Sequence, residues 1–172
     1  VRWGGLFLQG EYKTEAISTF LNLTTAVSGY NKIDYFEQSE SDWICMSGFT
    51  AKTGLNYNLN EHSNVFVNLG YLSKVRSYRN FYKGYSTEFA DELDNEVIRA
   101  IEVGYTYGSP RFSLFFNAYY TKWQNKPGRR VYSKYNLQPG DDGYIPDDPD
   151  SNNDKDVYAD IAGIDQRHMG LE

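Results

Sequence analysis

Residues 48–74 alternate between apolar and polar side chains with a period of two, and a short polar segment interrupts the alternation once. Every second residue of 49–59 is apolar or threonine, and the residues between them are polar or glycine; 65–71 repeat the pattern. Successive side chains on a strand point to opposite faces. The stretch therefore predicts a β-hairpin that turns at 60–63 and has one apolar and one mostly polar face.

The same alternation recurs along the chain and predicts an all-β protein. The expected fold is an antiparallel up-and-down meander of about seven strands. The chain ends within a strand-like pattern, so we expect 1–172 to be one partial domain. Besides the hairpin, the expected strands are 2–12, 16–35, 95–107, 111–123 and a last one from 156 onward.

The connections between these strands alternate in length. Segments 13–15, 60–63 and 108–110 are short, whereas 37–42, 75–94 and 125–155 are longer. In a meander, all short turns then lie at one end of the sheet and all long loops at the other. This asymmetry is typical of outer-membrane β-barrels.

Tyrosines near the short turns agree with a barrel wall. They lie on the apolar face just before a turn, where an aromatic girdle would meet the membrane interface. The residues concerned are Tyr12, Tyr57, Tyr105 and Tyr107.

Composition excludes several classes of protein. The mean hydropathy is −0.64, and no apolar run approaches the ~20 residues of a membrane-spanning helix. The net charge of −6 argues against nucleic acid as a partner. The single cysteine, Cys45, has no His or second Cys nearby, so we expect no disulfide and no metal site there.

The two strand faces divide the candidate functional residues. We expect the polar face to line the barrel lumen with Lys52, Asn56, Asn68, Glu102 and Asn117. We expect the apolar face to contact lipid through Leu55, Tyr57, Val67, Leu69, Val103, Tyr105, Leu114 and Phe116. Arg99 and Lys122 share the apolar parity but lie towards the long loops, where a charge is tolerated.

Two loops contain candidate ligand contacts, because aromatic rings bind sugar faces and cations hold acidic groups. The candidates are Arg76, Tyr78, Arg79 and Tyr82 in one loop, and Tyr132, Tyr135 and Tyr144 in the other. The acidic stretch 141–156 suggests calcium, but an EF-hand loop from Asp150 would need Gly at Lys155 and Glu at Ile161. We predict no cofactor, no metal and no catalytic residues, since no nucleophile lies near a base.

Three segments resemble the barrel of Bacteroidetes-type TonB-dependent receptors. They are GFTAKTGLNYNLNEHSNVFVNLGYLSK at 48–74, NEVIRAIEVGYTYGSPRFSLFFNAYYTKWQNK at 95–126 and GIDQRHMGLE at 163–172. The resemblance covers about 49–172, weakens over 2–47 and fails in 129–156. It departs from the family at Val97, where Lys is usual.

The resemblance implies a transmembrane β-barrel of about 22 strands in the bacterial outer membrane, filled by a plug. It implies energised uptake of a bulky nutrient such as a siderophore, glycan or cobalamin, and no enzymatic activity. The implied partners are the receptor's own plug and TonB, both outside this segment, together with outer-membrane lipid and the extracellular nutrient. Two alternatives stay open: a secreted or surface β-sandwich that binds carbohydrate, and a passive porin or adhesin barrel.

Overall fold

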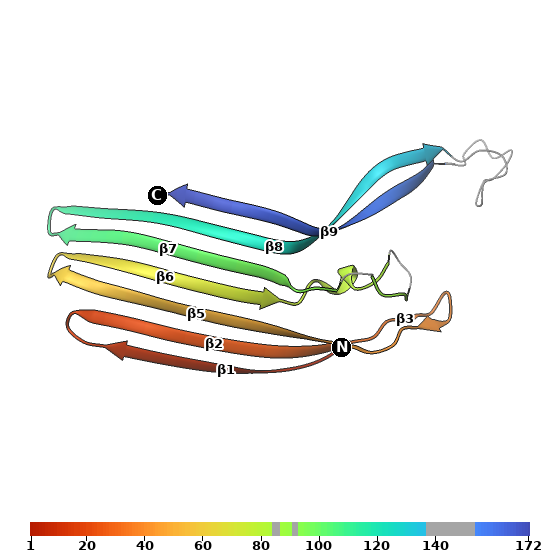
Figure 1. Ribbon diagram of the computed structural model, residues 1–172, viewed down its shortest axis with the longest axis horizontal. Helices are drawn as coiled ribbons and strands as arrows, with labels where there is room; N and C mark the ends of the chain where they lie inside the picture. Colours follow the sequence, from red (N-terminus) through yellow and green to blue (C-terminus); the bar gives the residue numbers. More distant parts are fainter. Residues whose placement is uncertain (84–86, 91–92, 137–153) are drawn as a thin grey trace.

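The computed structural model contains one open, seven-stranded antiparallel sheet whose strand order is β1-β2-β5-β6-β7-β8-β9 (Figure 1). It describes the chain except residues 84–86, 91–92 and 137–153, and only the backbone of 79, 129–136 and 154–162. The strands are β1 (Arg2–Lys13), β2 (Ile17–Tyr30), β5 (Ile44–Asn60), β6 (Ser63–Lys74), β7 (Glu96–Ser109), β8 (Phe112–Asn136) and β9 (Asp154–Leu171). The predicted all-β meander is confirmed.

Two small elements lie in the long connections. Strands β3 (Ile33–Asp34) and β4 (Ser39–Glu40) form a separate two-stranded sheet between β2 and β5. A 3-10 helix, η1 (Tyr78–Asn80), lies between β6 and β7. The expected long strand 16–35 therefore ends earlier, at Tyr30, and the chain forms this small hairpin before β5.

The alternation of short and long connections is confirmed. Figure 1 shows the turns β1–β2, β5–β6 and β7–β8 at one end of the sheet, whereas β2, β6 and β8 end and β5, β7 and β9 begin at the other. A backbone hydrogen bond joins the β5–β6 turn to the end of β7, since the N–H of Gly108 donates to the carbonyl of His62 at 2.8 Å. We refer to the two ends as the turn end and the loop end.

The expected connection 125–155 was too long. Strand β8 continues to Asn136 and β9 begins at Asp154, so the two strands pair well beyond Trp123. Pro127 and Gly128 favour a loop by composition, yet both lie inside β8. Register shifts after Trp123 and Lys126 interrupt the pairing there, and such bulges accommodate a proline within a strand.

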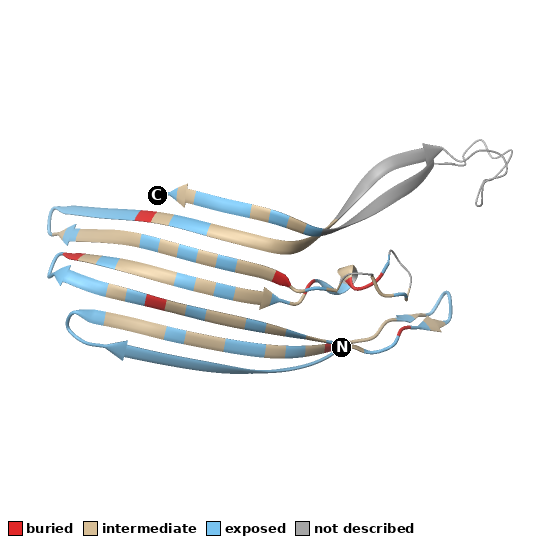
Figure 2. Ribbon diagram, viewed as in Figure 1, coloured by how far each residue is buried: buried red, intermediate tan, exposed pale blue. Residues whose placement is uncertain are grey.

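The sheet is a single layer, and neither face forms a closed hydrophobic core. Among the described residues, the buried apolar side chains are Phe81 and Tyr82, and both lie in the β6–β7 connection. Exposed and half-buried residues alternate along much of β5, β6 and β7, whereas every residue of β1 is exposed (Figure 2). No helix in the described part of the chain is long and apolar enough to span a membrane.

Candidate functional site

The strand pairing sorts the side chains into two faces as the alternation predicted. On one face, which we call the apolar face, Leu55 pairs in register with Val67, and Val67 with Val103. Leu55, Leu69, Val103, Leu114 and Phe116 are each between 43% and 47% exposed, so no other described element covers them. Tyr57 and Tyr105 belong to the same face near the turn end.

The opposite face, which we call the polar face, contains a hydrogen-bonded row across β6, β7 and β8. The side-chain amide of Asn68 donates to Oε2 of Glu102 at 2.9 Å, and that of Asn117 donates to Oε1 at 2.8 Å. One carboxylate thus accepts an amide from each neighbouring strand. Asn117 is buried, and its own side-chain oxygen has no hydrogen-bond partner.

Two other predicted lumen residues lie outside this row. Asn56 donates its side-chain amide to the oxygen of Asn58 at 3.1 Å, nearer the turn end. Lys52 is exposed and pairs in register with Asn22 and Gly70. The structure therefore brings Asn68, Glu102 and Asn117 together and leaves Lys52 and Asn56 apart from them.

Three aromatic rings on the polar face cover glycines of the neighbouring strand. Phe20 pairs with Gly54, Phe66 with Gly104 and Tyr119 with Gly170. A Cβ at any of these glycines would come within 2.7 Å of its partner ring. Each glycine therefore provides the space that lets a large ring lie flat on the sheet.

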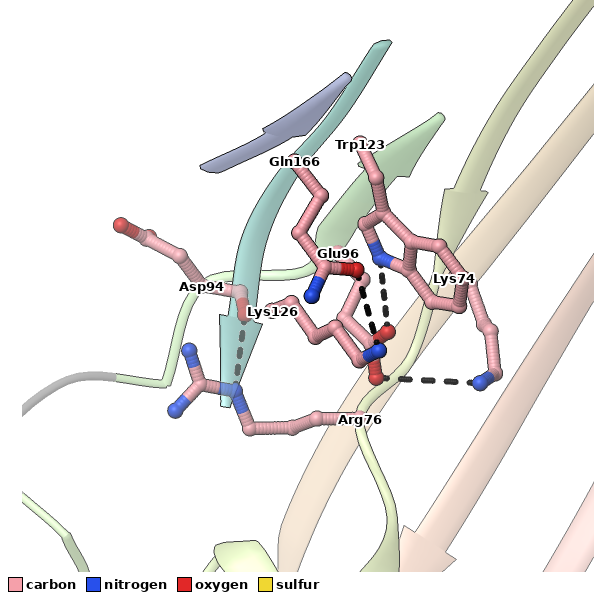
Figure 3. A network of polar contacts seen from close by, with 7 residues as sticks. All are labelled: Lys74, Arg76, Asp94, Glu96, Trp123, Lys126 and Gln166. Atoms are coloured by element: carbon pink, nitrogen blue, oxygen red, sulfur yellow. Dashed lines mark hydrogen bonds and ion pairs between the residues drawn. The ribbon is translucent and has the colours of Figure 1, made fainter. Parts of the chain in front are cut away.

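At the loop end, the polar face carries a second polar cluster, which the sequence analysis missed (Figure 3). Glu96 is buried; it accepts a hydrogen bond from the indole N–H of Trp123 at 3.0 Å and pairs with Nζ of Lys74 at 3.7 Å. The ammonium groups of Lys74 and Lys126 lie 5.9 and 4.5 Å from the Trp123 ring centroid, within the range of a cation–π contact. Lys126 also donates to the side-chain oxygen of Gln166 at 3.2 Å.

A bulge in β8 places Lys126 in this cluster. Trp123 and Lys126 are three residues apart, so in a regular strand their side chains would point to opposite faces. Asn125 adopts a positive φ of 57°, and the register with β9 shifts by one residue between them. The extra residue rotates Lys126 onto the polar face beside Trp123, as bulges do where a side chain is re-aimed. Strict alternation could not have predicted this.

Two long connections pack together at the loop end and enclose the small buried core. The Ser41 hydroxyl lies 3.2 Å from the Tyr82 hydroxyl, and the ring of Tyr82 stacks on that of Phe89. Phe81 is fully buried against the ring of Tyr30. The β2–β5 and β6–β7 connections thus form one packed unit.

The predicted ligand contacts in the first loop occupy different environments. Arg76 and Tyr82 are 4% and 3% exposed, and Arg76 donates its Nε–H to the carbonyl of Asp94 at 2.9 Å. Tyr78 is 39% exposed, and burial together with the neighbouring Tyr82 raises the pKa of its phenol above the ordinary value. Of these three, Tyr78 is the side chain that a ligand reaches without rearrangement.

The remaining predicted contacts lie outside the described residues. Tyr144 and most of the acidic stretch 141–156 fall within 137–153, and the side chains of Arg79, Tyr132 and Tyr135 are likewise not described. In the described part of the chain, no three His, Cys, Asp or Glu side chains gather as metal ligands. Cys45 is an exposed free thiol.

Comparison with known proteins does not place the chain in a family. A scan against family models and searches of curated proteins and solved structures found no match for this sequence or fold.

Proposed function

We propose that this chain forms part of the wall of a bacterial outer-membrane β-barrel of the TonB-dependent receptor class, which takes up a bulky nutrient. The observation that carries the proposal is the apolar face: a continuous surface over seven strands that no other described element covers. Contiguous apolar patches of this extent mark a surface that contacts lipid or protein. A barrel wall presents such a band to the bilayer.

The arrangement of polar groups supports the same assignment. The row formed by Asn68, Glu102 and Asn117 faces away from the apolar face, as a lumen lining does in a wide barrel. The described residues of the β2–β5 and β6–β7 connections lie at the opposite end from the turns, where a nutrient would arrive from outside the cell.

The single layer of the sheet disfavours the alternative of a β-sandwich. A sandwich packs a second sheet about 10 Å from the first, over its apolar face. The described residues place no second sheet there, because the short β3–β4 pair lies beyond the loop end. A plug-free porin would share this wall, and the TonB-dependent class is preferred on the segment resemblance described above.

A depth series of arginine substitutions tests the proposal. Leu55→Arg places a charge in a central register row of the apolar face, and Leu114→Arg places one near the turn end. A lipid-facing charge costs about 2–4 kcal/mol at the bilayer midplane and about 0–1 near the interface. We therefore expect Leu55→Arg to abolish assembly of the full-length protein in outer membranes, and Leu114→Arg to reduce it only slightly.

The matched control is Asn56→Arg, which changes the adjacent residue on the polar face. We expect it to assemble nearly as well as the wild type. Assembly is measured as the fraction of protein in the outer membrane that resists urea extraction. Equal assembly of the Leu55→Arg and Asn56→Arg variants would refute the lipid-facing assignment.

A further inference from the structure

Three cations lie side by side on the apolar face. Arg99 of β7 pairs in register with Lys122 of β8, and Lys122 pairs in register with Arg167 of β9. Directly opposed side chains on neighbouring strands have Cβ atoms about 4.5–5.5 Å apart. The three residues therefore form one cationic row, although they are 23 and 45 residues apart in the sequence.

The described residues supply no anion to this row. Arg99 lies over the ring of Tyr71, 5.7 Å from its centroid, and hydrogen-bonds to the side-chain oxygen of Gln124. The nearest acid along β9 is Asp165, which forms no ion pair with any described residue. Like charges directly opposite one another destabilise a sheet unless a counter-charge is present.

The row lies at the border of the apolar band. In β7, Tyr107 at the turn end lies eight positions after Arg99, a length of eight residue steps. At about 3.3 Å per residue and a strand tilt near 40°, they span roughly 20 Å of depth, close to the ~25 Å band of a membrane barrel. From the Ile101 row to the turn end, the described side chains of this face carry no charge.

An apolar groove adjoins the row on the side of the band. It has a volume of about 430 Å³ and lies over β7, β8 and β9. Its lining includes Ile101, Tyr120 and Met169, which form the next register row. A groove lined by apolar side chains directly below three cations fits a ligand that has an acyl chain and an anionic headgroup.

We propose that Arg99, Lys122 and Arg167 form a binding site for a phosphate-bearing membrane lipid, whose acyl chain occupies the groove. The row provides up to three charged donors for phosphate oxygens, and Arg binds phosphate in a bidentate manner. The inference rests on the proposed function, since it needs this face to contact a bilayer. It adds to that function a lipid that is bound specifically at one place on the wall.

The test measures lipid retained by the full-length protein purified in detergent, by native mass spectrometry. The probes are phosphatidylglycerol and phosphatidylcholine with identical acyl chains, and inorganic phosphate as a competitor. A Lys or Arg near an anionic headgroup contributes about a fivefold gain in binding. We expect combined substitution of Arg99, Lys122 and Arg167 by Gln to weaken phosphatidylglycerol binding about a hundredfold and to leave phosphatidylcholine unchanged.

Two further variants separate charge from folding. Exchanging the three residues for the other basic residue (Arg99→Lys, Lys122→Arg, Arg167→Lys) should retain the preference for phosphatidylglycerol. Replacing Lys13 and Lys52 by Gln on the polar face should also retain it. Unchanged phosphatidylglycerol binding in the Gln variant would overturn the site.

The outcomes distinguish this inference from the proposed function. If inorganic phosphate competes fully while the two lipids bind equally, the row binds free anions and the lipid assignment is wrong. If the wild type is found in membranes but the Gln variant binds lipid normally, only the lipid site fails. If the wild type is found in the aqueous fraction instead, the proposed function itself fails.

Discussion

At the scale of single residues, Glu102 connects three strands of the sheet through one carboxylate. It is half-buried and accepts amide donors from both neighbouring strands. Hydrogen bonds to a charged group contribute more than neutral ones, and leaving buried donors unpaired costs about 1–3 kcal/mol. Its carboxylate therefore joins β6, β7 and β8 on a face that lacks a hydrophobic core.

We predict that Glu102→Ala destabilises the folded protein by about 1–3 kcal/mol, because it leaves the amides of Asn68 and Asn117 unpaired. Glu102→Gln should cost less, since its remaining carbonyl oxygen still accepts one of the two donors. The measurement is the midpoint of denaturant unfolding in detergent. Glu61→Gln in the exposed β5–β6 turn is the control and should leave the midpoint unchanged. A Glu102→Ala midpoint equal to that of the wild type would show that the row adds no stability.

In the β2–β5 connection, the Asp34 carboxylate interacts with backbone groups of its own turn. The backbone N–H groups of Glu37 and Phe36 donate to the Asp34 carboxylate and hold its pKa below the usual range. The turn that joins β3 to β4 is thereby closed by a side chain that mimics a backbone turn. Asp34 is half-buried, and these hydrogen bonds of its carboxylate stay within the turn.

At the scale of elements, the glycine–aromatic pairs decide how closely the rings lie on the strands. A Cβ at Gly104 would lie 2.3 Å from the Phe66 ring and 2.9 Å from the carbonyl oxygen of Phe116, whereas Gly108 in the same strand has nothing within 4 Å. The Phe66 ring also stacks on Phe115, with centroids 6.1 Å apart. Displacing Phe66 would therefore disturb three strands.

We predict that Gly104→Ala costs about 1–3 kcal/mol through overpacking. Gly108→Ala is the matched control in β7 and should be neutral or slightly stabilising, because it restricts the unfolded chain without a clash. Thermal unfolding of both variants in detergent, followed by circular dichroism, provides the comparison. Equal midpoints would mean that the ring moves aside at no cost.

At the scale of the whole molecule, the sheet is a single layer whose apolar face is uncovered. This face therefore requires lipid, detergent or a protein partner to shield it from water. We predict that the full-length wild-type protein stays folded and monodisperse in detergent and aggregates when detergent is removed. Gel filtration and circular dichroism before and after removal measure this. A soluble monomer that unfolds cooperatively in plain buffer would contradict the membrane assignment.

The sequence predicted the faces of the sheet better than the extent of its strands. Period-two alternation placed Leu55, Val67 and Val103 on one face, because small errors in the strand boundaries do not change the face on which a residue lies. It failed beyond Trp123, where a bulge changes the parity and Pro127 suggested a loop. Alternation describes each strand separately, so it also could not find groups that only cross-strand register brings together.

The candidate site shows the same limit. Glu102 and Asn117 were predicted as lumen residues, but their shared hydrogen bonds depend on the register of β7 with β8. Trp123, Lys74 and Glu96 were missed, because a Trp near a strand end is equally typical of an interface residue. Arg76 and Tyr82 were chosen for their chemistry, and their burial follows from the packing of two loops that are distant in sequence.

Strands that are neighbours in the main sheet also follow one another along the chain, and this order allows the sheet to grow or shrink during evolution. Each strand of the main sheet pairs only with the strands of that sheet that precede and follow it along the chain. Duplicating or deleting one two-stranded hairpin would therefore leave every remaining strand with the same direction. Each strand would also keep its apolar side chains on the same face and its short turn at the same end of the sheet. The width of the sheet could change in steps of two strands while the loop end, the tyrosines near the turn end and the apolar face keep their places.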